Sequence, residues 1–148
     1  MPAQTVLEEL TQDELTKDHV ERRVEDWVER VEQLYRDIKS WLPAGWTARR
    51  GPSVTIREPL MEKFSIPARE KDSLELLHDG EIITEVWPYG LWIIGANGRL
   101  DLVKGNDIYV VTDQAKTFEA PEWKIADACS RRKIKAFDRS KLNVILDS

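Results

Sequence analysis

The chain has 148 residues, of which 41% are hydrophobic and 33% are charged, a composition typical of one globular domain. Its 27 acidic and 22 basic residues give a formal net charge of −5, which excludes a protein that binds nucleic acid through overall positive charge. No apolar run reaches the roughly 18 residues of a membrane span, and the N-terminal sequence has neither the basic start nor the apolar stretch of a secretion signal. We therefore expect a cytoplasmic protein that is not associated with a membrane.

The N-terminal part of the chain carries the net charge. Residues 1–42 contain eleven acidic and six basic side chains, whereas residues 43–148 contain sixteen of each. Residues 1–16 are expected to form a tail or a short helix. Over residues 17–42 apolar side chains recur at steps of three and four, which predicts one long amphipathic helix. Its exposed face is expected to be acidic.

After this helix the apolar pattern changes to that of short strands. Val54 and Ile56 alternate with polar residues, and later apolar runs are separated by turn sequences; these runs cover residues 74–78, 81–87, 91–95, 99–103 and 107–112. Turns of two to four residues join antiparallel neighbours, so the sequence predicts an antiparallel meander. Because the run 91–95 is apolar on both faces, we expect it to be the central strand.

The C-terminal part is predicted to continue the sheet and to end in a helix. Residues 113–122 have the composition of a loop, and short strands are expected at 123–126 and 133–137. Asp138 is a predicted N-cap for a closing helix that extends to residue 146. The expected fold class is α+β: residues 17–148 form a single domain, with the long helix packed on five to seven antiparallel strands between about residues 53 and 137.

Four charged residues form a candidate metal site. Asp101 and Asp113 lie in consecutive predicted strands, and an acid-x-lysine triplet follows at Glu122 and Lys124. Over about 25 residues this arrangement loosely resembles the hairpin of restriction-endonuclease-type nucleases. In such enzymes carboxylates hold Mg²⁺ and a lysine stabilises the developing negative charge. The resemblance implies a metal-dependent nuclease with these four residues as catalytic groups and Asp101 and Asp113 as metal ligands. The lysine after Asp113 comes one position too late for that pattern, and Glu122 and Lys124 follow a loop that contains Pro121 where the pattern has an uninterrupted strand.

A basic stretch in the C-terminal part could contact phosphate groups. It contains Arg131, Arg132, Lys133 and Lys135, with Trp123 and Phe137 nearby as stacking partners for bases. The alternative is that this stretch is a solvated edge of the sheet or an internal partner of the acidic helix.

The aromatic residues divide into core and interface candidates. Six tryptophans occur, and Trp27, Trp41 and Trp92 follow apolar patterns typical of a core. Trp46, Trp87 and Tyr89 lie beside glycine and proline in turn-like sequence, where large rings are difficult to bury. We expect these three to form a partner interface.

No nucleophile, general base or zinc cluster is recognisable from spacing. His19 and His78 are expected at the surface or in a turn, and Cys129 has neither a base nor a metal-binding partner nearby in the sequence. The favoured hypothesis is therefore a non-enzymatic interaction module without a cofactor, an accessory, adaptor or inhibitor-type subunit. It would bind a protein partner, or a second copy of itself, through its acidic helix and exposed aromatics. The alternative is a nucleic-acid-binding protein or nuclease-like enzyme.

Overall fold

The described residues form one long helix, two short helices and a seven-stranded antiparallel sheet, which confirms the predicted α+β class. The computed structural model describes residues 16–93, 96–129 and 133–148, so the predicted N-terminal tail or helix lies outside the described residues except for Thr16. Within the described part, no helix is long and apolar enough to cross a membrane.

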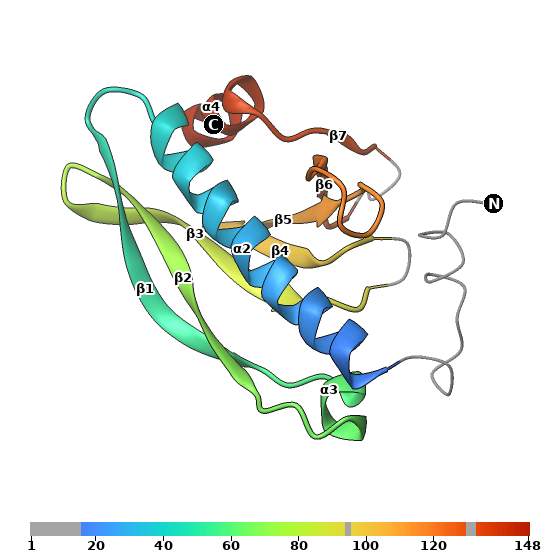
Figure 1. Cartoon of the computed structure of the whole chain (residues 1–148). Helices are drawn as coiled ribbons and strands as arrows, with labels where there is room; N and C mark the ends of the chain where they lie inside the picture. The colour runs from blue at the N-terminus through green and yellow to red at the C-terminus, as the bar shows by residue number, and fades with distance from the viewer. Residues whose placement is uncertain (1–15, 94–95, 130–132) are drawn as a thin grey trace.

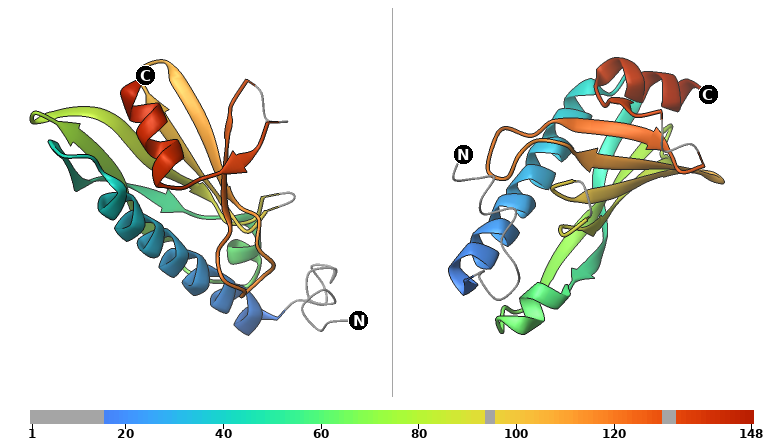
Figure 2. Two further views of the ribbon diagram at one scale, coloured as in Figure 1. Left: turned by 90° about the horizontal axis from the view of Figure 1, so that it is seen from above. Right: turned by 90° about the vertical axis from the view of Figure 1, so that its right-hand side faces the viewer.

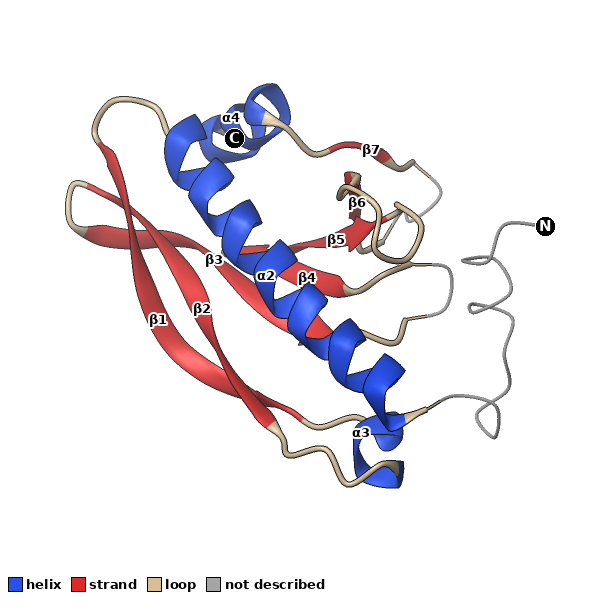
Figure 3. Cartoon of the chain, in the orientation of Figure 1, coloured by secondary structure: helices blue, strands red, loops and turns tan. Residues whose placement is uncertain are grey.

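The seven strands pair in chain order, each antiparallel to the next (Figures 1 and 3). This is the meander that the short turns predict. The strands are β1 (Trp46–Ile56), β2 (Arg69–His78), β3 (Glu81–Gly90), β4 (Arg99–Lys104), β5 (Asp107–Asp113), β6 (Trp123–Asp127) and β7 (Lys135–Ala136), with a short helix α3 (Pro59–Lys63) between β1 and β2.

The long helix α2 (Lys17–Trp41) lies across the concave face of the curved sheet (Figures 1 and 2). Thr16 caps it, because its Oγ1 accepts a hydrogen bond of 3.1 Å from the backbone N–H of His19. The apolar stripe of α2 packs on inward-facing strand residues in one core cluster; its members include Trp27, Val31, Leu34, Leu76, Val86, Leu100, Leu102 and Val111. The helix is therefore held by tertiary burial.

The C-terminal helix α4 (Arg139–Asp147) closes one end of the same core (Figure 2). The predicted cap is confirmed, because the Asp138 carboxylate accepts a hydrogen bond of 2.9 Å from the N–H of Lys141. Leu142 is fully buried and Ile145 is 2% exposed. The core expectation for tryptophan is also confirmed: Trp27 is 1% exposed, and Trp41 and Trp92 are partly buried against the core.

The expectation of a central strand at residues 91–95 is wrong for the described residues 91–93. β3 instead continues through Pro88 to Gly90, and the chain then leaves the sheet, with Ile93 and Ala96 forming an isolated bridge. The Glu58 carboxylate causes this departure, because it accepts hydrogen bonds from the N–H groups of Leu91 and Trp92. A carboxylate has replaced a neighbouring strand as the partner of these amides.

Strand β1 begins at Trp46, seven residues before the predicted start of the sheet at residue 53. Its register with β2 shifts between Arg50 and Ser53, on either side of Gly51 and Pro52. A Cβ atom at Gly51 would lie 2.6 Å from the Ser73 hydroxyl oxygen, so the bulge requires glycine there. This bulge interrupts the alternation by which a strand is recognised in sequence.

The apolar stripe of α2 is covered along its whole length within the single chain. Residues at both ends of the helix are buried, from Val20 at 0% exposure to Ile38 at 0%. A helix that overhangs a small sheet would leave apolar surface for a second copy, but the curved sheet and α4 together cover this one. Apolar overhang therefore gives no reason to expect a homodimer.

Val31→Asp is expected to reduce the free energy of unfolding by about 4 kcal/mol or to prevent folding, because it places an unpaired carboxylate in the core. Val31 is fully buried in the middle of α2. Thermal and urea unfolding measure the loss. Glu29→Asp introduces the same side chain at an exposed position of the same helix and should change stability by less than about 1 kcal/mol. Similar melting temperatures for the two variants would contradict this packing.

Candidate functional site

The buried ion pair of Arg30 and Asp113 joins α2 to the end of β5. Arg30 Nη1 lies 2.6 Å from Asp113 Oδ2, and the two side chains are 6% and 0% exposed. Arg30 also donates through Nε to Asp26 at 2.6 Å and through Nη2 to the carbonyl of Glu119. Each of the three guanidinium nitrogens thus donates a hydrogen bond, as a buried cation requires.

Asp113 also shapes the loop of residues 114–122. Its Oδ1 accepts hydrogen bonds from the N–H groups of Ala115 at 3.0 Å and Glu122 at 2.9 Å, at the two ends of the loop. The loop is closed a second time by Gln114 N–H, which donates to the Glu122 carbonyl at 2.9 Å. The carboxylate that the sequence offers as a metal ligand is therefore bonded to one cation and two amides.

The two aspartates of the candidate metal site lie on opposite faces of the sheet. Asp113 follows the inward-facing Val111, whereas Asp101 lies between the buried Leu100 and Leu102 and points to the other face. There Asp101 pairs with Arg99 at 2.8 Å. The structure does not bring these two carboxylates together.

Glu122 and Lys124 pair with each other at the start of β6. Lys124 Nζ lies 3.5 Å from Glu122 Oε1, and the glutamate side chain is 60% exposed. Across the described residues, no group of three or more histidine, cysteine, aspartate or glutamate side chains is placed to hold a metal ion. The nuclease hypothesis therefore has no convergent carboxylates in this part of the chain.

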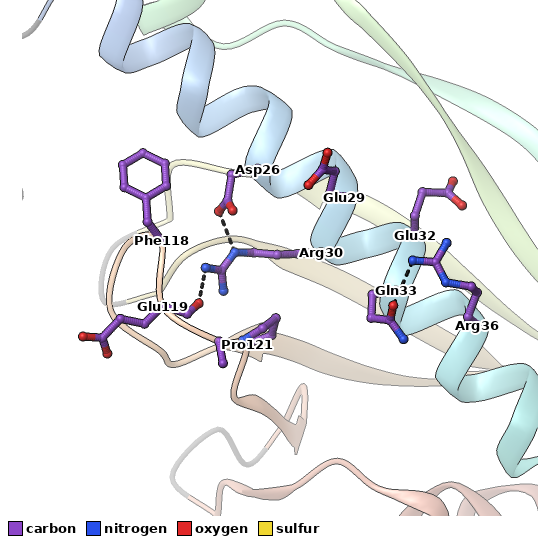
Figure 4. Close-up of a pocket in the computed structure, with 10 residues that line it drawn as sticks. Asp26, Glu29, Arg30, Glu32, Gln33, Arg36, Phe118, Glu119 and Pro121 are labelled. Atoms are coloured by element: carbon purple, nitrogen blue, oxygen red, sulfur yellow. Dashed lines mark hydrogen bonds and ion pairs between the residues drawn. The ribbon is translucent and has the colours of Figure 1, made fainter.

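A groove separates α2 from the 114–122 loop (Figure 4). It encloses about 590 Å³, and a second hollow of about 380 Å³ continues it toward the start of the helix. The two hollows share Asp26, Glu29 and Phe118. We call this combined feature the α2 groove; it is lined by Asp18, Glu21, Arg22, Glu25, Asp26, Glu29, Arg30, Glu32, Gln33, Arg36, Phe118, Glu119, Ala120 and Pro121.

The α2 groove combines an acidic rim with apolar loop residues. Seven of its lining residues are acidic and three are basic. Glu29 and Glu119 are exposed and have no ion-pair partner among the described residues, so their charges face solvent. Phe118 and Pro121 project from the loop opposite the helix (Figure 4). The arrangement suits a ligand that is both cationic and partly apolar.

Phe118 is held against the start of α2 in an unusual backbone conformation. Its φ angle is 65°, in the left-handed region that bulky residues rarely adopt. The Arg22 guanidinium lies over its ring at 4.8 Å from the centroid, and the ring of His19 meets it edge-on at 5.9 Å. His19, expected at the surface, is only 9% exposed, and burial lowers the pKa of its imidazole.

Basic residues of β1 and β2 pair with two acidic residues of α2 that also line the α2 groove. Glu32 pairs with Arg50 at 2.8 Å and with Lys71, and Arg69 pairs with Glu25. The hydrogen bond from Arg50 is the main cause that lowers the pKa of Glu32 to about 2. The alternative interpretation of the basic C-terminal stretch, an internal partner of the acidic helix, is not supported by these pairs, since their cations come from β1 and β2.

The three predicted interface aromatics lie away from the α2 groove. Trp46 packs on His78 with ring centroids 4.9 Å apart, at the paired ends of β1 and β2. Trp87 is opposite Asp101 on the sheet face that α2 does not cover. Tyr89 is 59% exposed, and the Arg99 guanidinium lies 4.1 Å from its ring centroid. The acidic helix α2 therefore lies on one face of the sheet, and Trp87 and Tyr89 lie on the opposite face.

Two residues that shape the groove, Arg30 and Phe118, were not among the site residues predicted from the sequence. Arg30 interrupts the apolar stripe of α2 beside Trp27 and Val31, and a charge on a buried helix face signals a partner carboxylate. Phe118 is an aromatic residue in a polar loop, a feature typical of interaction surfaces. Of the basic stretch, Arg131 and Arg132 lie outside the described residues, whereas Lys133 and Lys135 are exposed.

Comparison of the chain with protein-family models, with curated proteins and with solved structures gives no match.

Asp113→Ala is expected to lower the free energy of unfolding by about 3 kcal/mol, because it leaves the Arg30 cation buried without its main partner. The amides of Ala115 and Glu122 should also exchange faster with solvent. Urea unfolding and amide hydrogen exchange measure the two effects. Asp101→Ala, which removes a partly exposed pair, should cost about 1 kcal/mol or less. Equal losses in the two variants would contradict the structural role of Asp113.

Glu32 is expected to contribute acid-sensitive stability. Its folded-state pKa of about 2 lies below the ordinary value of 4.5, so its stabilisation is complete above about pH 4.5 and is lost as the pH falls toward 2. Glu32→Gln should lower the free energy of unfolding at pH 7 by about 1 kcal/mol, since the carboxylate is partly exposed. Urea unfolding at several pH values should show this difference unchanged from pH 7 to 5 and absent near pH 2. A constant difference throughout would contradict the assignment.

Proposed function

We propose that this protein is a non-enzymatic interaction module that binds a basic segment of a protein partner in the α2 groove. The observation that carries the proposal is the groove itself, an acidic channel with an apolar loop wall beside a fully packed helix. Four of the seven acidic lining residues are ion-paired, which leaves Asp18, Glu29 and Glu119 as acids without an ion-pair partner among the described residues. An accessory, adaptor or inhibitor-type subunit would use such a surface for a partner.

The dimensions of the α2 groove favour a peptide segment. Its helix wall extends from Asp18 to Arg36, which is about 27 Å at roughly 1.5 Å per residue. An extended peptide of about eight residues spans that length at roughly 3.3 Å per residue. A small molecule would contact only part of such an open surface.

The walls of the groove are fixed before any partner binds. Arg30 connects the helix to Asp113 and to the Glu119 carbonyl, so the loop carrying Phe118 and Pro121 is tied to α2. A preformed surface loses little conformational entropy on binding. This organisation supports a binding role for the loop.

Trp46, Trp87 and Tyr89 remain part of the interaction hypothesis as a second, separate contact area. Tyr89 is the most exposed of the three and is stacked on Arg99. Because Trp87 and Tyr89 lie on the face opposite α2, a partner engaging both areas would have to wrap around an edge of the sheet.

Nucleic-acid binding or nuclease activity is the second candidate function. The exposed Lys133 and Lys135 support phosphate contact. The separation of Asp101 from Asp113 by the sheet gives less support to a metal-dependent reaction.

A cytoplasmic location is also part of the proposal, since the exposed and unpaired thiol of Cys129 suits a reducing compartment.

Binding is tested with a fluorescent ten-residue peptide of alternating arginine and valine, followed by anisotropy. We expect saturable binding that weakens as salt rises, because long-range charge attraction is screened. Glu29→Lys should weaken binding by about tenfold or more, since it reverses a charge at the centre of the groove. Glu81→Lys makes the same change at an exposed position on the distant β2–β3 turn and should have a smaller effect.

A second variant tests the apolar wall. Phe118→Asn removes the ring but keeps a residue that tolerates the left-handed conformation, so the loop should retain its shape. Peptide binding should fall while the melting temperature stays within a few degrees. Equal binding of a peptide with glutamate in place of arginine, or equal effects of Glu29→Lys and Glu81→Lys, would contradict the proposal.

A further inference from the structure

A second cavity lies at the other end of the sheet and shares no residue with the α2 groove. It encloses about 210 Å³ where β5, β6, the segment entering β7 and α4 meet. Its lining residues are Tyr109, Ile125, Ala126, Asp127, Lys133, Lys135 and Lys141. We call it the lysine pocket.

The lysine pocket brings together three cations without paired carboxylates. Lys133, Lys135 and Lys141 form no ion pair within the described residues, and Asp127 is the one acidic residue in the lining. The Asp127 carboxylate accepts a hydrogen bond of 2.8 Å from the N–H of Cys129. The pocket therefore has an excess of positive charge in a chain whose net charge is −5.

Buried or half-buried lysines elsewhere in the structure have partners. Lys71 pairs with Glu32 and with Asp72, and Lys104 donates to backbone carbonyls at the end of α4, including that of Ile145 at 2.8 Å. Like charges that share a cavity repel one another unless an anion lies between them. Lys141 is half-buried, Lys133 and Lys135 are exposed, and for these three cations the lining supplies one protein anion, Asp127.

The three lysines come from two segments around an apolar floor. Lys133 lies just before β7, and Lys135 is the first residue of that strand. Lys141 lies in the first turn of α4. Ile125 and Ala126 are buried below them. Tyr109 adds a phenol hydroxyl, a hydrogen-bond donor whose pKa is raised mainly by burial.

We propose that the lysine pocket binds the phosphate group of a small phosphomonoester. A phosphate dianion offers three terminal oxygens to several ammonium donors, which a single carboxylate cannot match. The cavity volume admits a phosphate with a small attached group. The acidity of the whole chain opposes a long polyanion, which favours a small ligand over a nucleic acid.

The proposal is tested by isothermal titration of the intact protein with inorganic phosphate, phenyl phosphate and a mononucleotide. Saturable binding of at least one of them is expected. Lys135→Gln and Lys141→Gln should each weaken it by about fivefold or more, because each removes one charge-assisted hydrogen bond. Lys116→Gln changes an exposed lysine of the 114–122 loop outside the pocket and should leave the affinity unchanged.

Three outcomes would overturn the proposal. They are no binding of any of the three ligands at millimolar concentration, equal binding by the Lys141→Gln variant and the original protein, and binding only of single-stranded oligonucleotides with affinity that increases with length. The last outcome would assign the lysines to a nucleic-acid surface. Circular dichroism of each variant confirms folding, and the peptide experiment on the α2 groove is independent of every one of these results.

Discussion

The ion pair of Arg30 and Asp113 is the interaction on which the helix, the sheet and the 114–122 loop depend together. Removing two charges from water is costly, and a buried pair is tolerated only when the remaining donors and acceptors are also bonded. Here Asp113 has two backbone amides in addition to Arg30, and Arg30 has Asp26 and the Glu119 carbonyl in addition to Asp113. The pair therefore specifies one position of the loop relative to α2.

The charge of α2 is divided between two flanks with different roles. On one flank Glu25 and Glu32 are matched by cations from β1 and β2, which fasten the helix over the sheet. Toward the loop, Arg30 pairs with Asp26, whereas Glu29 and Glu119 have no ion-pair partner among the described residues. The acidic residues of α2 thus include both groups that attach the helix to the sheet and groups that face solvent.

Much of the fold was predictable because local signals agreed with tertiary packing. The helix expected at residues 17–42 ends at Trp41, and the short turns correctly imply an antiparallel meander. The strand expected at 91–95 is wrong for residues 91–93, where a distant carboxylate, Glu58, accepts the hydrogen bonds of two amides that a strand neighbour would have taken. The candidate metal site could not be judged from sequence for a similar reason. The partner of Asp113 is 83 residues away on α2, and strand parity, which places Asp101 on the other face, follows only from the observed register.

The bulge at Gly51 and Pro52 hinders the addition of a strand from another chain to β1. β1 is an edge of the sheet, and an open edge with regular backbone spacing invites another chain to add a strand. Pro52 has no N–H to offer, the register shift breaks the repeat, and Arg49 and Arg50 place charge along the same stretch. The opposite edge, β7, is only two residues long. Addition of a strand from another chain, as in fibrils or domain-swapped copies, is thereby disfavoured at both edges of the sheet.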